Sequence, residues 1–231
     1  MLVAARNPLN IGAAARAMSN FGITCLRVVN PYSIAFREAR SAVGAAAVLE
    51  SAEEFATLAE ATADCSLVVG TTAATSRHLQ QNLRTLQEGA PLLRDRLQSS
   101  AVAVVFGSEK RGLSNDDLSH CHWLLNIPTH DQHKSMNLGQ AVAVCLYELT
   151  RDTVAGPVES VEFASAAQID RITSGLVHIL KTSGYFNAAS SSSAEQRVRR
   201  FVRRLSIHSA DSEMLLGMLR QISWKLDSDS A

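Results

Sequence analysis

The first two thirds of the chain alternates apolar runs with segments whose apolar residues recur at helical spacing. The apolar runs predict buried strands at residues 23–29, 65–70, 101–106 and 124–127, and the short run at residues 1–5 could open a sheet. Helical patterns are expected at residues 11–21, 35–48 and 52–63. Strands that are apolar throughout and alternate with helices are typical of a parallel sheet covered on both faces. We therefore expect an α/β fold.

The pattern changes after Arg151. Residues 153–160 include Gly156-Pro157 and are predicted to be a linker. Three helical patterns follow without an intervening strand, at residues 167–182, 194–206 and 211–226. We therefore expect an α/β domain over residues 1–155 and a small all-helical extension over residues 156–231.

Residues 124–149 combine a strand, a polar loop and a helix. Pro128 cannot donate a hydrogen bond to a sheet, so the strand should end there, and the helical pattern begins at Leu138. Ser135 and Asn137 then lie at a helix N-terminus, whose free N–H groups suit an electron-rich ligand. The alternative is that one of them simply caps the helix.

Composition narrows the class of protein. The 231 residues are 46% hydrophobic, and no apolar run approaches the ~20 residues that a membrane span needs. The N-terminus lacks the basic-then-apolar order of a signal peptide, so we expect a cytoplasmic protein without a membrane segment. The four cysteines follow no metal-binding spacing, and His130 and His133 have no third ligand nearby. We expect neither a metal site nor disulfides.

Positive charge is local rather than global. Lys and Arg together number 22, as do Asp and Glu, so no net field attracts a polyanion. However, five arginines fall within residues 195–204, beside an apolar stripe formed by Val198, Phe201, Val202 and Leu205: Arg197, Arg199, Arg200, Arg203 and Arg204. They form either an ordinary solvated helix face or a surface for nucleic acid.

Three loops that follow apolar runs carry most of the unusual residues. Residues 107–112 have the glycine spacing of a phosphate loop, but Leu113 and Ser114 stand where lysine and serine or threonine are required, which disfavours such a loop. No G-x-G-x-x-G motif follows a strand, and Ser108 lacks the G-x-S-x-G context of a hydrolase nucleophile. A conventional nucleotide-binding enzyme is therefore disfavoured.

Taken together, the three loops resemble motifs 1, 2 and 3 of the SpoU group of SPOUT RNA methyltransferases. The matching segments are N-I-G-A-A-A-R (residues 10–16), V-V-F-G-S-E-K-R-G-L (104–113) and I-P-T-x6-S-M-N-L (127–138). The resemblance implies a SPOUT fold with a deep trefoil knot at the C-terminal end of the domain, S-adenosylmethionine as cofactor, and a homodimer with active sites at the subunit interface.

The arginine-rich tail resembles the C-terminal extension of the TrmJ branch of this group. That branch methylates the ribose 2′-hydroxyl of tRNA anticodon-loop nucleotide 32, a cytidine or uridine. The resemblance therefore implies tRNA as substrate, with Arg197, Arg199, Arg200, Arg203 and Arg204 contacting its phosphates. The alternatives are a non-catalytic RNA-binding protein of the same fold, or a methyltransferase for rRNA or another tRNA position.

The resemblance also assigns residues. Active-site positions of the family correspond to Asn10, Arg16, Glu109, Ser135 and Asn137. The cofactor would contact Thr72, Ala73, Ala74, Gly107, Ile127, Lys134, Ser135 and Met136. Ala74 stands where this branch usually has an arginine. Arg16 is expected either to act as general base or to bind an RNA phosphate, in which case the phosphate or Glu109 takes the proton.

Overall fold

The computed structural model describes residues 1–32, 34–36, 39, 46–73, 81–130, 132–151, 162–186 and 191–229. Within these residues, two parallel sheets form the centre of the fold. The first has strand order β1-β2-β3, with β1 at Leu2–Val3, β2 at Arg27–Val29 and β3 at Glu53–Phe55. The second has strand order β5-β7-β4-β6, with β4 at Leu67–Thr71, β5 at Leu83–Thr85, β6 at Val102–Val105 and β7 at Trp123–Asn126.

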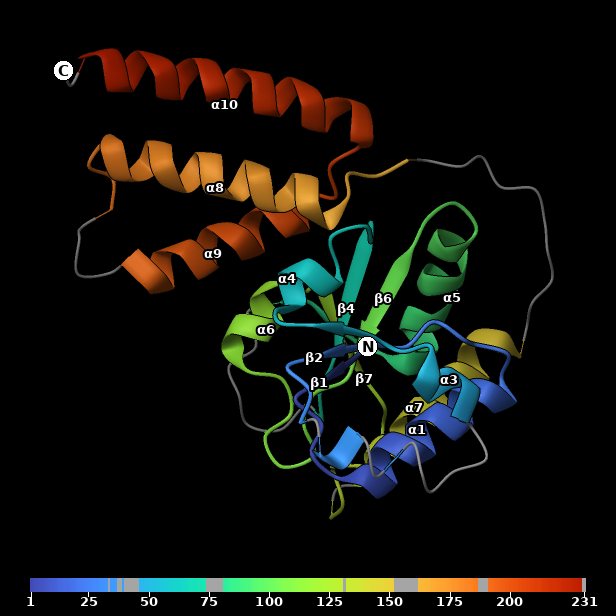
Figure 1. Ribbon diagram of the computed structural model, residues 1–231. Helices are drawn as coiled ribbons and strands as arrows, with labels where there is room; N and C mark the ends of the chain where they lie inside the picture. Colours follow the sequence, from blue (N-terminus) through green and yellow to red (C-terminus); the bar gives the residue numbers. More distant parts are fainter. Residues whose placement is uncertain are drawn as a thin grey trace.

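The two sheets meet between β1 and the end of β6. Val3 N–H donates to the Phe106 carbonyl at 2.8 Å, and Phe106 N–H donates to the Met1 carbonyl at 3.0 Å. All strand pairs within both sheets are parallel, and Leu2 and Phe106 also form a parallel bridge. The expected parallel sheet is therefore confirmed, and the start of the chain lies beside β6 (Figure 1).

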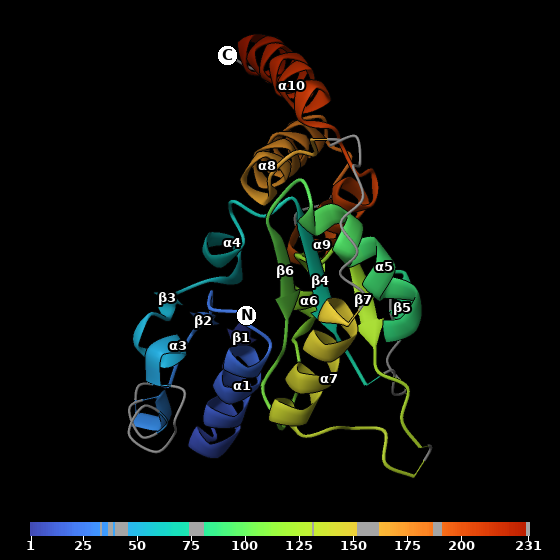
Figure 2. The same ribbon diagram turned by 90° about the vertical axis from the view of Figure 1, so that its right-hand side faces the viewer.

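Helices cover both faces of this sheet (Figure 2). One core lies beneath α1 (Pro8–Asn20), α5 (Leu86–Leu97) and α7 (Leu138–Thr150). The opposite core includes residues of α4 (Leu58–Ala61), α6 (Asn115–Ser119) and the first residue of α8 (Ala166–Thr182). Near the start of α7, a Cβ on Gly139 would lie 2.5 Å from the Ala13 Cβ, so this glycine lets α7 approach α1 closely.

The sequence pattern missed two strands. The helix expected at residues 52–63 is wrong, because this segment contains β3 and only the short α4. β3 is an edge strand with exposed Glu53 and Glu54, so it carries no apolar run. β5 is also an edge strand, and α5 starts directly after it because Thr85 and Glu88 form a capping box. Of the helix expected at residues 35–48, the described part includes the start of α3 (Ala46–Glu50).

The tail forms α8, α9 (Ser191–Arg204) and α10 (Ser209–Asp229), which share a third hydrophobic core. The three expected helices are thus confirmed, whereas the expected linker at residues 153–160 lies outside the described residues. Backbone hydrogen bonds join the start of α8 to the α/β part: Ala166 N–H donates to the Cys65 carbonyl at 2.8 Å, and Ala167 N–H donates to the Ala63 carbonyl at 3.0 Å. Within the described ranges, no helix is both long and apolar enough to cross a membrane.

Candidate functional site

A cavity of about 530 Å³ lies at the carboxyl ends of β4, β6 and β7. Parallel neighbours end at the same edge of a sheet, so the loops after these strands meet there although they are distant in sequence. Seven of the eight residues that the sequence assigns to the cofactor line this cavity: Thr72, Ala73, Gly107, Ile127, Lys134, Ser135 and Met136. The eighth, Ala74, lies outside the described residues.

The loop after β6 forms a tight turn at the cavity. Gly112 N–H donates to the Ser108 carbonyl at 2.8 Å, and Gly112 has a φ of +66°, a conformation that glycine adopts without strain. A Cβ on Gly107 would lie 2.1 Å from the Gly112 carbonyl carbon, which is a severe clash with backbone. Only glycine at position 107 therefore allows this turn to close against the end of the strand.

Asn10, Glu109 and Asn137 form a polar cluster beside the cavity. The Glu109 carboxylate accepts hydrogen bonds from Arg6 N–H at 3.2 Å, Asn7 N–H at 3.1 Å and Asn10 Nδ2 at 3.2 Å. Asn137 Nδ2 donates to Asn10 Oδ1 at 2.7 Å. Thus the start of α1, the loop after β6 and the start of α7 are joined by side chains that the sequence assigned to one site.

The Glu109 carboxyl is held in its ionised form. Partial burial opposes ionisation, but hydrogen bonds from its own backbone and from the Arg6, Asn10 and Asn7 groups outweigh that effect, so the pKa of Glu109 lies below its usual value. Both carboxylate oxygens already accept hydrogen bonds. Glu109 is therefore suited to orienting its neighbours and poorly suited to accepting a proton.

Asn137 caps α7 and also belongs to the cluster. Its Oδ1 accepts from Gly139 N–H at 2.9 Å and Gln140 N–H at 3.3 Å, while its Nδ2 donates to Asn10. Ser135 does not cap the helix, but lines the cavity. Asn137 is therefore the helix cap, and Ser135 belongs to the candidate ligand site. Asn137 also contacts that site through its hydrogen bond to Asn10.

Arg16 is placed apart from this cluster. It is exposed on α1 and is not among the residues that line the cavity. It follows Asn10 by six residues, about 9 Å along a helix axis at 1.5 Å per residue. Among the five predicted active-site residues, Glu109 and Ser135 line the cavity, Asn10 and Asn137 are joined to Glu109, and Arg16 lies on the outer face of the helix.

The arginines of α9 are not equivalent. Arg197 and Arg204 are exposed, but Arg200 is buried and the Arg203 side chain is completely inaccessible. Arg203 pairs with Asp170 at 2.9 Å, and Arg199 pairs with Asp116 and donates to Ser119 Oγ at 2.9 Å. Arg203 therefore does not belong to the exposed face of α9, and its contact with an RNA phosphate stays a prediction.

Burial also corrects the apolar stripe predicted for α9. Val198 and Val202 are buried, whereas Phe201 and Leu205 are about half exposed.

Elsewhere, the described part of the chain contains no group of three or more His, Cys, Asp or Glu side chains that could hold a metal ion.

The protein has a parallel α/β fold with a ligand-sized cavity at the carboxyl edge of its sheet and a polar cluster beside the cavity. This arrangement is typical of α/β enzymes that bind a small molecule at the carboxyl ends of their strands. The chain belongs to the SpoU methylase family: the family model described as "SpoU rRNA Methylase family" matches residues 1–147. This confirms the resemblance inferred from the three motifs.

Similarity to TrmJ proteins extends through the tail. The tRNA (cytidine/uridine-2'-O-)-methyltransferase TrmJ of Yersinia pestis (strain Pestoides F) is 35% identical over 231 residues, covering 96% of this chain and 90% of the relative. The protein of the same name from Photorhabdus laumondii is 32% identical over 235 residues, with 96% and 95% covered. The crystal structure of TrmJ from Z. mobilis ZM4 superposes with a TM-score of 0.82 at 30% identity, covering 96% of each chain.

Proposed function

We propose that the protein transfers a methyl group from S-adenosylmethionine to the ribose 2′-hydroxyl of a tRNA nucleotide, the cytidine or uridine at anticodon-loop position 32. The observation that carries this proposal is the convergence of the motif 2 and motif 3 loops on one cavity, with Asn10 of motif 1 hydrogen-bonded to Glu109 beside it. The TrmJ relatives, whose names specify tRNA cytidine and uridine 2′-O-methylation, support the substrate because they align with 96% of the chain, including the tail.

The residues around the cavity fit the cofactor. A volume of about 530 Å³ lies within the ~300–1,000 Å³ range of small-molecule sites. Apolar side chains such as Leu125, Ile127 and Leu138 offer a wall for a flat ring, and the Gly107 turn brings backbone close to the cavity. When bound, S-adenosylmethionine supplies an electrophilic methyl group on a sulfonium. In this proposal Thr72, Ala73, Ala74, Gly107, Ile127 and Lys134–Met136 hold it.

The polar cluster would orient the acceptor ribose. Glu109 holds Asn10 in place, Asn10 accepts from Asn137, and the three side chains have a fixed relation to the cavity. Glu109 and an RNA phosphate are both weak bases for the hydroxyl proton, and the hydrogen bonds that lower the pKa of Glu109 also occupy both of its carboxylate oxygens. A guanidinium remains protonated in proteins, so Arg16 is better suited to binding that phosphate than to acting as general base.

Exposed apolar residues on α1 and α7 support the proposed homodimer. Leu9 is 73% exposed on α1, and Val144 and Tyr147 are 37% and 55% exposed on α7. These residues are spread along the helix pair, since Tyr147 lies beside Phe21, at the opposite end of α1 from Leu9. Exposed apolar side chains along adjacent helices can form a protein interface. A dimer formed through these helices would bring Arg16 to the interface, which fits active sites that two subunits share.

Two further features of the proposal concern topology and RNA contact. β7 lies between β4 and β5, both of which precede it in the chain, and this order is compatible with the trefoil knot expected of the family. On α9, Arg197 and Arg204 are the exposed members of the five arginines proposed to contact RNA phosphates.

The test is incubation of the protein with labelled S-adenosylmethionine and unmodified tRNA, followed by mapping of the methylated ribose. Label on the 2′-oxygen at position 32 is expected. Arg16→Ala should abolish transfer, whereas Arg16→Lys should keep substantial activity because lysine also binds phosphate. The matched control is Arg220→Lys, an exposed arginine on α10. Bound tRNA without methyl transfer would contradict the enzyme assignment, and near-complete loss in Arg16→Lys would contradict phosphate anchoring.

A further inference from the structure

A second cavity, of about 330 Å³, lies at the opposite edge of the same sheet. Ser66, Asn82 and His122, which directly precede β4, β5 and β7, line it. It therefore faces the amino ends of these strands, and the carboxyl ends of β4 and β7 reach the first cavity. The other wall comes from the tail, including Ile169 of α8 and Arg203 and Arg204 at the end of α9. The cavity therefore lies where the tail meets the α/β part.

The lining of this cavity is strongly cationic. Four arginines line it with a single carboxylate, that of Asp95, and the arginines are Arg84, Arg96, Arg203 and Arg204. They come from β5 and α5, which follow one another in the chain, and from α9, which is distant in sequence. Burial lowers the pKa of Arg96, whose guanidinium carbon lies 3.3 Å from the centre of the Phe163 ring. These positive charges thus converge in a partly desolvated space.

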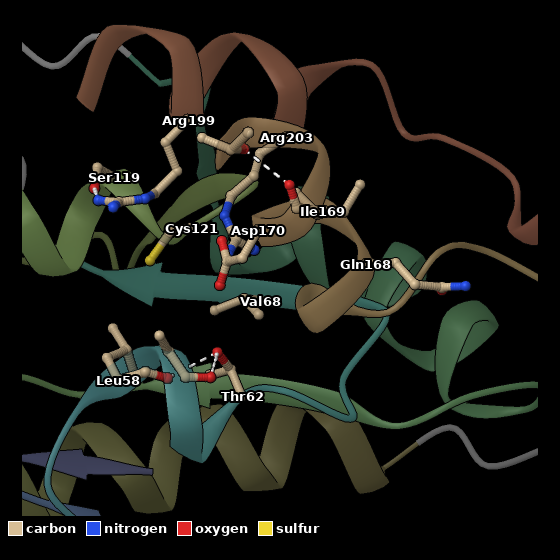
Figure 3. Close-up of polar contacts among 12 residues, drawn as sticks. Leu58, Thr62, Val68, Ser119, Cys121, Gln168, Ile169, Asp170, Arg199 and Arg203 are labelled. Atoms are coloured by element: carbon tan, nitrogen blue, oxygen red, sulfur yellow. Dashed lines mark hydrogen bonds and ion pairs between the residues drawn. The ribbon is translucent and has the colours of Figure 1, made fainter. Parts of the chain in front are cut away.

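Arg203 is the most constrained of these side chains. Its side chain has no exposed surface, and Nη2 donates to Asp170 Oδ1 at 2.9 Å. Figure 3 shows Arg203 extending from α9 towards the sheet, beside Asp170 and Cys121 and above Val68 of β4. Within the described ranges, Arg203 Nε and Nη1 and Arg84 Nε are buried and have no hydrogen-bond partner. Buried donors without a partner are costly, and those of a charged group are the costliest.

His122 adds a neutral donor. Its Nδ1 accepts from Val68 N–H at 3.0 Å, so the neutral ring carries its proton on Nε2. Burial and then the charge of Arg203 lower the pKa of His122 to about 3. The nearby His120 has its pKa lowered to about 4 by burial and by Arg199 and Arg203. Burial is thus the main reason that both histidines stay neutral, and the arginine charges add to it, although Asp170 and Asp116 partly offset these charges at His120.

We propose that this second cavity binds a phosphate group, held by Arg84, Arg96 and Arg203 with His122 as a neutral donor. Guanidinium groups bind phosphate oxygens by charge-assisted and often bidentate hydrogen bonds. A phosphate has acceptors on several sides, as donors from three separate elements require. The cavity is several times larger than the ~30 Å³ that one water molecule occupies in the liquid, so it can hold the ion with some hydration. The phosphate comes either from free phosphate or from RNA.

The test is calorimetric titration of inorganic phosphate into the full-length protein, with sodium chloride at matched ionic strength as the blank. Saturable binding at one site is expected. Arg84→Gln and Arg203→Gln should each weaken it at least tenfold, whereas Arg220→Gln, on the exposed face of α10, should leave it unchanged. Arg84 lies on an edge strand and is only partly buried, so its variant is expected to fold, and circular dichroism checks both variants.

A competition experiment distinguishes the two sources of phosphate. If RNA supplies the group, phosphate should weaken tRNA binding to the unmodified protein more than chloride does, and Arg84→Gln should remove this difference. If free phosphate is the ligand, phosphate and tRNA should bind independently of one another. Absence of saturable phosphate binding, or equal binding in Arg84→Gln, Arg203→Gln and the control, would overturn the proposal. Neither readout uses S-adenosylmethionine, so failure here is separate from failure of the methyltransferase assignment.

Discussion

Asn137 has two roles that substitution can separate. Its Oδ1 caps α7, and its Nδ2 reaches Asn10 at 2.7 Å beside the cavity. Serine is as good a cap as asparagine but is too short to keep the contact with Asn10. Alanine loses both interactions. The pair Asn137→Ser and Asn137→Ala therefore compares loss of the site contact alone with loss of the contact and the cap.

The expected magnitudes follow from these contacts. Loss of the Asn137–Asn10 hydrogen bond should lower the free energy of unfolding by about 1 kcal/mol in both variants. Loss of the cap should cost about 1 kcal/mol more in Asn137→Ala. For a chain of this size, 1 kcal/mol corresponds to about 2–4 °C in Tm. We expect Tm to fall by about 2–4 °C in Asn137→Ser and about 4–8 °C in Asn137→Ala.

Methylation should respond differently from stability. Both variants lose the contact that fixes Asn10, so both should show a similar fall in methyl transfer to tRNA, measured well below either Tm. The matched control is Ser165→Ala, which removes the cap of α8 away from the cavity and should lower Tm without changing activity. Asn137→Ser with activity equal to that of the unmodified protein would refute a role for the contact. Equal Tm values for the two Asn137 variants would refute the capping role.

Two further predictions concern the Gly107 turn and a buried histidine. Gly107→Ala places a Cβ 2.1 Å from the Gly112 carbonyl carbon, so we expect S-adenosylmethionine affinity to fall at least tenfold in calorimetry, and unchanged affinity would show that the turn can rearrange. The pKa of His122 is lowered from 6.5 to about 3, so unfolding takes up a proton between these values, and stability is full above pH 6.5 and lost as pH falls towards 3. In His122→Asn the side-chain oxygen can replace Nδ1 as acceptor but does not titrate. Between pH 4 and 6 the free energy of unfolding, measured in urea, should therefore fall by about 1.4 kcal/mol less per pH unit than in the unmodified protein. An equal pH slope in both proteins would contradict this.

The sequence motifs located the loops at the first cavity more accurately than helical periodicity located the buried face of α9. Each motif loop directly follows an apolar run, so periodicity locates it, and parallel strands bring the loops to one edge. Asn10 and Asn137, which are far apart in sequence, therefore meet. Arg16 was grouped with them by its motif, but six residues of helix place it outside the cavity.

The burial of Arg203 could not be found by the same reasoning. Helical periodicity identifies a face from local polarity, and it assigned Phe201 and Leu205 to the inside and the arginines to the outside. The partner that makes burial of Arg203 tolerable, Asp170, lies on another helix, and its position depends on the packing of α8 against α9. No local pattern carries that information. β3 and β5 were missed for a related reason, because edge strands need no continuous apolar run.

The strand order also constrains when the protein can finish folding. β5 lies at the edge of its sheet and pairs with β7, which is synthesised only after α5, β6 and α6. During translation β5 therefore waits for a partner that has not yet been made, and parallel pairing over such separations is slow. The first cavity also needs residues 134–138. A ribosome-bound chain that stops before α7 would lack Leu138 and Ala141 from the cavity wall, so ligand binding requires synthesis at least through the start of that helix.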